Sequence, residues 1–180
     1  MRPTRNAPKL EAADLYEYAV RVLSVRTYSS EALRTKLKNR ALRTGDVDAA
    51  IERLVEVGYL DDARFAESFA RYKVEGAGLG RSRVLSDLRG QRIPPKVAEQ
   101  AVEQIYEGKN EADLIDAYIE RRLPALKAGV PVEDQKVLAR AYNRLRRAGF
   151  SSSGSLAAIK RRAAQPDLLE EPAEDDAEQE

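Results

Sequence analysis

The 180-residue sequence contains no cysteine and no histidine. These absences exclude disulfides, thiolate and imidazole metal sites, cysteine nucleophiles and any catalytic triad that needs an imidazole base. Uninterrupted apolar stretches are only a few residues long, so we expect neither a signal peptide nor a membrane-spanning helix, and we expect a cytoplasmic protein. The composition therefore argues against most common hydrolase chemistry, and we expect no metal or other cofactor.

The near-neutral charge of the whole chain, 31 basic against 30 acidic residues, conceals an uneven distribution. Residues 167–180 hold eight acids and no base, which leaves residues 1–166 with 31 bases and 22 acids. The acidic segment has too few apolar residues to fold alone. We therefore expect a flexible N-terminus over residues 1–10, a basic folded body, and a disordered acidic tail over residues 167–180.

The alternating β-branched runs that mark strands are also missing, whereas apolar residues recur at spacings of three and four. This periodicity is typical of amphipathic helices and predicts an all-α protein. The expected helices span residues 12–26, 29–42, 46–57, 61–75, 81–91, 95–107, 110–126, 132–148 and 152–164.

Three copies of one pattern follow each other along the chain. When three leucines near the ends of the middle helices are aligned, each is followed five residues later by another apolar residue. Eight and nine residues beyond that residue, each copy has an alanine and then a branched apolar residue. The first helices align through one apolar pair spaced by four residues, which lies on one helix face. The aligned sets are Leu37, Leu88, Leu145; Leu42, Ile93, Phe150; Ala50, Ala101, Ala158; Ile51, Val102, Ile159; and, in the first helices, Leu15, Phe65, Leu114 and Ala19, Phe69, Tyr118.

The offsets of 51 and 57 residues predict three tandem three-helix repeats, at 11–60, 61–109 and 110–166. About fifty residues make a small core, so neighbouring repeats are expected to bury surface against each other. We therefore expect an elongated, curved array of three repeats, with a single globular bundle as the alternative.

The stretch GYLDDARF, residues 58–65, contains two adjacent aspartates. Gly58 suits the left-handed position that follows a helix, Asp61 suits the N-cap of the next helix, and Asp62 would face its positive end. Leu60 and Phe65 then occupy the two positions of a hydrophobic staple. The alternative, a metal site, would use Asp61, Asp62 and Glu67, but it lacks further ligands nearby in the sequence.

The middle helix of each repeat is basic: segments 32–43, 80–92 and 136–147 together hold 14 bases and one acid. One base follows the aligned leucine in every repeat, namely Lys38, Arg89 and Arg146. Successive helical residues are rotated by about 100°, so these bases point away from the apolar stripe. Other bases flank them: Arg34, Lys36, Arg81, Arg83, Arg92, Arg144 and Arg147.

If the repeats stack regularly, these side chains form one basic stripe that suits a polyanion or an acidic protein groove. The alternative is that they only keep the helices soluble.

Residues 58–94, GYLDDARFAESFARYKVEGAGLGRSRVLSDLRGQRIP, resemble the central motif of bacterial RecX proteins, which regulate the RecA recombinase. Residues 28–42 and 47–62 resemble the preceding repeat, and residues 144–159 resemble the last one. The resemblance implies three tandem three-helix repeats, no catalytic activity, and binding to the RecA nucleoprotein filament. Such binding would limit filament growth, strand exchange, ATPase and coprotease activity, and so modulate DNA repair and the SOS response.

The expected partners are therefore the RecA filament and single- and double-stranded DNA, contacted without sequence specificity, and no membrane. Heptads are absent, so we expect a monomer rather than a coiled-coil dimer. An alternative function is an independent helical DNA-binding protein that acts without RecA, in which a three-helix repeat works like a helix-turn-helix module.

Overall fold

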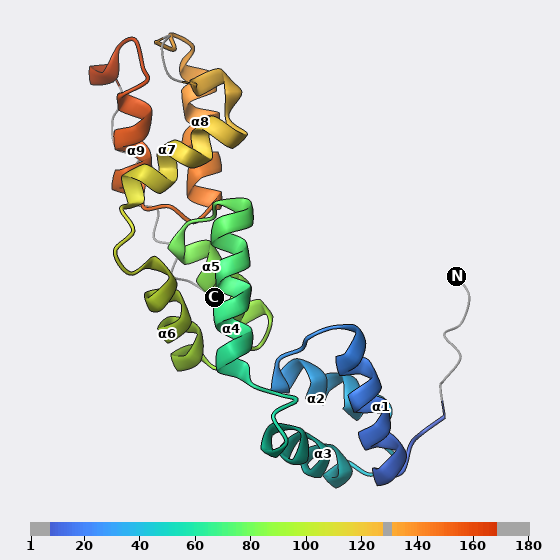
Figure 1. Ribbon diagram of the computed structural model, residues 1–180. Coiled ribbons are helices and arrows are strands. Elements are labelled where there is room, and N and C mark those ends of the chain that lie inside the picture. Colours follow the sequence, from blue (N-terminus) through green and yellow to red (C-terminus); the bar gives the residue numbers. More distant parts are fainter. Residues whose placement is uncertain (1–7, 128–130, 169–180) are drawn as a thin grey trace, which may run out of the picture. The chain divides into compact units, whose positions relative to one another are not determined.

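The computed structural model describes residues 8–127 and 131–168, and within them it contains nine α-helices and no strand beyond two isolated bridges (Figure 1). The predicted all-α helical-repeat class is confirmed. The α-helices are α1 (Ala12–Val25), α2 (Ser30–Lys38), α3 (Gly45–Glu56), α4 (Asp62–Tyr72), α5 (Arg81–Gly90), α6 (Pro95–Tyr106), α7 (Glu111–Arg122), α8 (Gln135–Arg147) and α9 (Ser152–Lys160).

All nine predicted helices are present, but several end earlier than expected. α2 stops at Lys38 rather than at residue 42. α7 stops at Arg122 because Pro124 follows, and a proline disfavours helical backbone at the residue before it. Three short non-α turns are also present: Lys73–Ala77 (η1) directly continues α4, Pro124–Leu126 (η2) follows α7, and Pro166–Leu168 (η3) lies after α9.

The described chain divides into two compact units. The first takes the chain up to Tyr72 together with Leu85–Ile105, and the second takes Lys73–Val84 together with the chain from Tyr106. The middle repeat is thus shared between the units, and α5 contributes its first turn to the second unit and its remainder to the first.

Each unit has one large apolar core. In the first unit, α1, α2 and α3 surround fully buried leucines, and Leu60 of the link to α4 closes this core. In the second unit, α7, α8 and α9 pack around Phe150, whose ring meets Tyr118 edge-on at a centroid distance of 5.6 Å. Burial of this apolar surface is the main stabilising contribution to both units.

The buried face of α4 is not the one that the repeat alignment predicts. Ala66 and Ala70 are completely buried, whereas Phe65 and Phe69 are only half-buried. In α7 the fully buried pair is likewise one residue later than predicted, at Ile115 and Ile119. The alignment of the first helices is therefore wrong by one residue in the second and third repeats.

The aligned leucines near the ends of the middle helices, Leu37, Leu88 and Leu145, are fully buried as the alignment predicts. After two of them the helix ends through a left-handed residue, with φ 60° at Arg92 and 94° at Gly149. The next amide then donates to the leucine carbonyl, over 3.2 Å from Ile93 to Leu88 and 3.3 Å from Phe150 to Leu145. This is the Schellman pattern of helix termination.

The first repeat ends its middle helix differently, so the predicted equivalence of Leu42 with Ile93 and Phe150 is wrong. The Ala41 amide donates to the Leu37 carbonyl over 2.8 Å, one residue sooner than in the other repeats. Ala41 is buried, whereas Leu42 is 55% exposed. The sequence predicts a flexible segment over residues 1–10, but Leu10 pairs with Ala41 in a parallel bridge. Residues 1–7 lie outside the described part of the chain.

Consecutive middle helices are joined end to end by hydrogen bonds within each unit. In the first unit, the Ser29 hydroxyl at the start of α2 donates to the Gln91 carbonyl at the end of α5 over 2.5 Å. In the second unit, the Gly80 amide at the start of α5 donates to the Ala148 carbonyl at the end of α8 over 2.8 Å. Each junction sets the positive end of one helix against the negative end of another, which is a favourable dipole arrangement.

We expect Gly149→Ala to destabilise the protein more than Gly108→Ala does. Both glycines are left-handed, with φ 94° and 68°, so an alanine costs about 1–2 kcal/mol at either position. A methyl group at Gly149 would also collide with the Arg83 backbone and disturb the α5–α8 junction, whereas nothing lies within 4 Å of the corresponding position at Gly108. Urea unfolding of both variants measures the difference, and equal losses would contradict the proposed close packing.

We expect the stability of the protein to fall at alkaline pH partly through Tyr106, whose hydroxyl donates to the Leu79 carbonyl over 2.6 Å. Burial raises the pKa of Tyr106 above its ordinary value, while the nearby Arg81 acts in the opposite direction. The contribution is therefore complete below the unfolded pKa of about 10 and is lost as the pH rises above it.

Tyr106→Phe should cost about 1 kcal/mol near pH 7 by removing the hydrogen bond. It should also flatten the decline of the free energy of unfolding above about pH 10. The control is Tyr59→Phe, at a side chain that is 56% exposed, which should keep the wild-type decline. If the free energy of unfolding declines equally in the wild type and in both variants, the expected contribution of Tyr106 is contradicted.

Candidate polyanion-binding surface

The three bases predicted to form the stripe all lie on the exposed side of their helices. Lys38, Arg89 and Arg146 each follow a fully buried leucine and are themselves exposed. Lys38 and Arg89 contact no carboxylate among the described residues, and Arg146 donates through Nη1 to the Phe150 carbonyl over 2.5 Å. The burial of the leucine fixes the rotation of each helix and so directs the following base to solvent.

The flanking bases differ in how far they are available to a ligand. Arg34 pairs with Glu31 at 3.0 Å and with Asp48, so its charge is largely compensated. Lys36 lies 5.7 Å from the centroid of the Tyr28 ring. These two bases are therefore held by their own repeat.

The other flanking bases are exposed. Arg92 donates to the Thr35 hydroxyl over 2.7 Å, and Arg147 donates to the Asn143 carbonyl over 3.2 Å. Arg144 has no ion-pair partner within the part of the chain that the structure describes. Arg81 lies 6.0 Å from the Tyr106 ring, and Arg83, beside the α5–α8 junction, is exposed.

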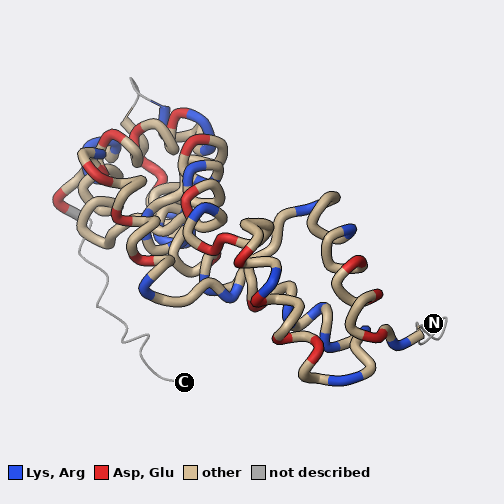
Figure 2. The backbone as a smooth tube through the Cα atoms, turned by 60° about the horizontal axis from the view of Figure 1, so that its bottom comes forward, with Lys and Arg blue, Asp and Glu red and all other residues tan. Residues whose placement is uncertain are grey.

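Each unit thus carries its own group of these bases. The first unit holds Arg34, Lys36, Lys38, Arg89 and Arg92, and the second holds Arg81, Arg83, Arg144, Arg146 and Arg147. Figure 2 shows acidic and basic positions interspersed along the backbone of both units. The excess of bases over acids in the sequence is confined to the middle helices. A single stripe that runs through all three repeats remains a prediction.

The GYLDD stretch has the geometry of a helix–helix link. Gly58 has φ 77°, and the amides of Gly58 and Tyr59 donate to the carbonyls of Val55 and Leu54 over 3.0 and 2.9 Å. Asp61 accepts from the Arg64 amide over 2.9 Å, the bond that an N-cap residue makes. Leu60 is buried in the first core, and the staple contact between Leu60 and Phe65 stays a prediction.

Asp62 has a role that the sequence did not suggest. Its carboxylate accepts from the amide of Ser30, the first residue of α2, over 2.8 Å. Glu111 has the same kind of role in the second unit, where Oε1 accepts from the Ser151 amide over 2.7 Å. The two contacts join residues that are separated by 32 and by 40 positions in the sequence, so no local sequence pattern predicts them.

No group of three or more carboxylates among the described residues could hold a metal ion. Asp61 and Asp62 already accept backbone N–H groups at helix starts, which leaves Glu67 without converging ligands from this stretch. In the same part of the chain, no helix combines the length and the apolar character that a membrane span requires.

Comparison with known proteins agrees with this description. Residues 61–102 match the family model described as RecX, second three-helix domain. The regulatory protein RecX of Syntrophotalea carbinolica is 31% identical over 140 residues, which cover 78% of this chain and 90% of that protein. The regulatory protein RecX of Vibrio parahaemolyticus is 32% identical over 151 residues, which cover 84% and 91%.

Solved structures show the same fold. The crystal structure of RecX from Lactobacillus salivarius matches with a TM-score of 0.69 at 18% identity, and the match covers 88% of this chain and 97% of that one. A second crystal structure, of a regulatory protein RecX, matches with a TM-score of 0.66 at 20% identity over 83% and 71%.

We expect Asp61→Ala to lower the free energy of unfolding by about 1 kcal/mol, because the Arg64 amide loses its cap. Asp61→Asn is the matched control, since asparagine caps a helix about equally well, and it should stay within a few tenths of a kcal/mol of wild type. Urea unfolding in EDTA and in magnesium chloride measures both variants. A stabilisation of wild type by magnesium that both variants lose would instead indicate a metal site.

Proposed function

This chain belongs to the RecX family of regulatory proteins, and we propose that it binds nucleoprotein filaments of the RecA recombinase through the exposed bases of its three middle helices. Bound in this way, it limits filament growth, strand exchange, ATP hydrolysis and coprotease activity, and so modulates DNA repair and the SOS response. Its action is that of a ligand that occupies the filament and not that of an enzyme.

The observation that carries this proposal is the exposure of one base at the same place in every repeat. Lys38, Arg89 and Arg146 follow leucines with no exposed surface, so the core itself determines where these charges point. A filament of protein and DNA is a repeating polyanion. Bases that recur once per structural repeat match such a partner better than a single basic patch would.

The end-to-end junctions support the same reading. A hydrogen bond from Ser29 to Gln91 joins α2 to α5 in one unit, and one from Gly80 to Ala148 joins α5 to α8 in the other. Within each unit, two middle helices that meet at their ends carry their exposed bases on either side of the junction.

A binding role also agrees with the hydrogen bonds of the two carboxylates that a metal-dependent enzyme would need. Asp61 and Asp62 accept backbone amides, and their removal from those caps would loosen the link between the first two repeats. DNA inside or beside the filament would be contacted through its phosphates, which explains why sequence selectivity is not expected.

The proposal is tested by reversing the three recurrent bases, as Lys38→Glu, Arg89→Glu and Arg146→Glu in one variant. Co-sedimentation with preformed RecA filaments on single-stranded DNA, over a salt series, should show affinity reduced by at least about tenfold at low salt. The same variant should lose inhibition of RecA ATP hydrolysis at equimolar ratio.

A matched control reverses one exposed base per repeat outside the middle helices: Arg21→Glu on α1, Lys96→Glu on α6 and Arg122→Glu on α7. It changes the net charge equally, so it should weaken binding much less if position matters. Circular dichroism and urea unfolding establish that both variants fold. Equal weakening by the two variants, or normal binding by the first, would refute the proposed surface.

A further inference from the structure

A groove in the first unit is lined by several aromatic side chains, one of which, Tyr28, also packs against the core of that unit. Its volume is about 680 Å³, within the range of small-ligand sites. Tyr28 and Tyr59 come from the links after α1 and α3, and Phe65, Phe69 and Tyr72 come from α4. We refer to these five rings and the space between them as the aromatic groove.

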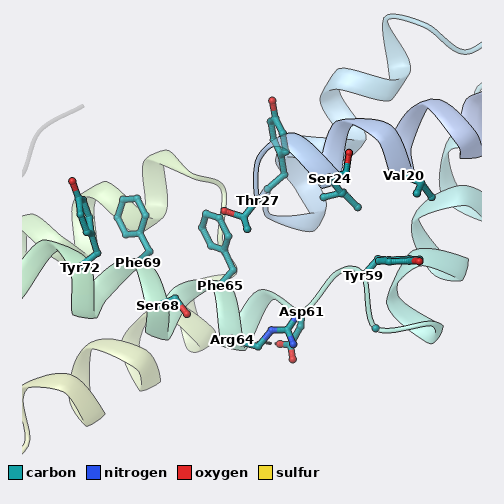
Figure 3. Close-up of a pocket in the computed structure, with 13 residues that line it drawn as sticks. Val20, Ser24, Thr27, Tyr59, Asp61, Arg64, Phe65, Ser68, Phe69 and Tyr72 are labelled. Atoms are coloured by element: carbon teal, nitrogen blue, oxygen red, sulfur yellow. Dashed lines mark hydrogen bonds between the residues drawn. The ribbon is translucent and has the colours of Figure 1, made fainter.

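The rings of α4 form a row on one side of that helix (Figure 3). Phe65, Phe69 and Tyr72 are spaced by four and three residues, which places them on one face. The first two rings are nearly parallel, with centroids 5.9 Å apart and an interplanar angle of 18°. Because Ala66 and Ala70 supply the buried face of the helix, this row is not required for the core.

Exposure of the groove residues is unusual for this protein. Six large apolar side chains are exposed within the described residues, namely Val25, Leu42, Val55, Val57, Tyr59 and Tyr72. All six belong to the first unit, and two of them line the groove. Tyr72 is 73% exposed and Tyr59 is 56% exposed. Exposed apolar surface that gathers around one hollow indicates a binding site.

The polar groups around the groove identify the kind of ligand. Arg26 and Lys36 lie 5.4 and 5.7 Å from the centroid of the Tyr28 ring. Neither cation has a carboxylate partner in the described part of the chain. Hydroxyl groups of Ser24, Thr27 and Ser68 also line the hollow. The lining itself carries one guanidinium, Arg64, and one carboxylate, Asp61, which accepts from the Arg64 amide at the start of α4. The groove therefore combines flat apolar faces and small hydrogen-bonding groups with two further cations beside one of its rings.

We propose that the aromatic groove binds the unstacked bases of a single-stranded nucleic acid, with the backbone phosphates against Arg26 and Lys36. Proteins that bind single strands without sequence preference use this combination of basic groups and stacking rings. A duplex does not fit, because its base faces are covered by stacking within the helix. An apolar protein segment is a weaker match, since five of the lining side chains are aromatic and the two cations beside Tyr28 have no carboxylate partner among the described residues.

This inference goes beyond the proposed filament binding, because the groove is built from α1, α4 and two links, and Lys36 is a middle-helix base that the charge-reversal variant leaves unchanged. It requires no RecA. Its failure would leave the proposed function standing, and failure of the charge-reversal experiment would leave the groove standing.

The experiment compares two 20-nucleotide single strands in the absence of RecA, one of thymidine residues and one of abasic residues that carry the same phosphates. Fluorescence anisotropy measures both with the full-length protein. The thymidine strand should bind at least about fivefold more tightly, which is the lower end expected when one base loses an aromatic partner. Equal affinities would overturn the proposal, because phosphate contacts alone would then explain binding.

Two substitutions locate the effect. Tyr72→Ala removes an exposed ring and should not affect folding, and Phe69→Leu removes a ring while keeping apolar volume. Each should reduce the preference for the thymidine strand by about fivefold, while affinity for the abasic strand stays the same. Tyr72→Phe, which keeps the ring, should retain the preference, and so should Val25→Ala, at an exposed apolar residue that does not line the groove.

A preference unchanged in Tyr72→Ala and in Phe69→Leu would overturn the proposal. So would a loss of RecA-filament binding in these two variants without any change in binding to the thymidine strand, because the groove would then hold a protein segment.

Discussion

The structure depends on one leucine near the end of each middle helix. Leu37, Leu88 and Leu145 have no exposed surface, and the carbonyl of each accepts the hydrogen bond that closes the helix and starts the link to the next one. Moving any of them to solvent would cost about 2–3 kcal/mol and rotate the helix. The constraint is therefore strong enough to fix the face on which every neighbouring charge lies.

Two consequences follow from this constraint. The residue after each leucine must face solvent, and in all three repeats that residue is a base. The helix ends also become contact points, because α5 and α8 finish through left-handed residues whose neighbouring carbonyls accept from the start of the preceding middle helix. At Arg92 this conformation costs about 1–2 kcal/mol for a residue with a side chain, and the guanidinium of the same residue donates to the Thr35 hydroxyl.

The repeats are alike in plan and different in packing. The first and third have leucine-, isoleucine- or phenylalanine-rich cores, whereas the fully buried residues of α4 in the middle repeat are two alanines. The larger rings of α4 are thereby left on its other face. A helix that is apolar on two faces can pack with one and leave the other available for a ligand, which is why α4 contributes three rings to the aromatic groove.

Sequence patterns were sufficient for the all-α helical-repeat class, the order of the nine described helices and the exposure of Lys38, Arg89 and Arg146, because these depend on local periodicity and on charge. The Asp61 cap and the left-handed Gly58 were equally accessible, since both are local backbone requirements. Only the tertiary structure decided which apolar face of α4 is buried, that Ala41 replaces Leu42 in the first core, and that Asp62 caps α2 across 32 residues. The physical reason is that the buried face is the one whose shape fits the neighbouring helices. Both faces of α4 are apolar, so hydropathy alone does not predict whether the alanine face or the phenylalanine face is buried.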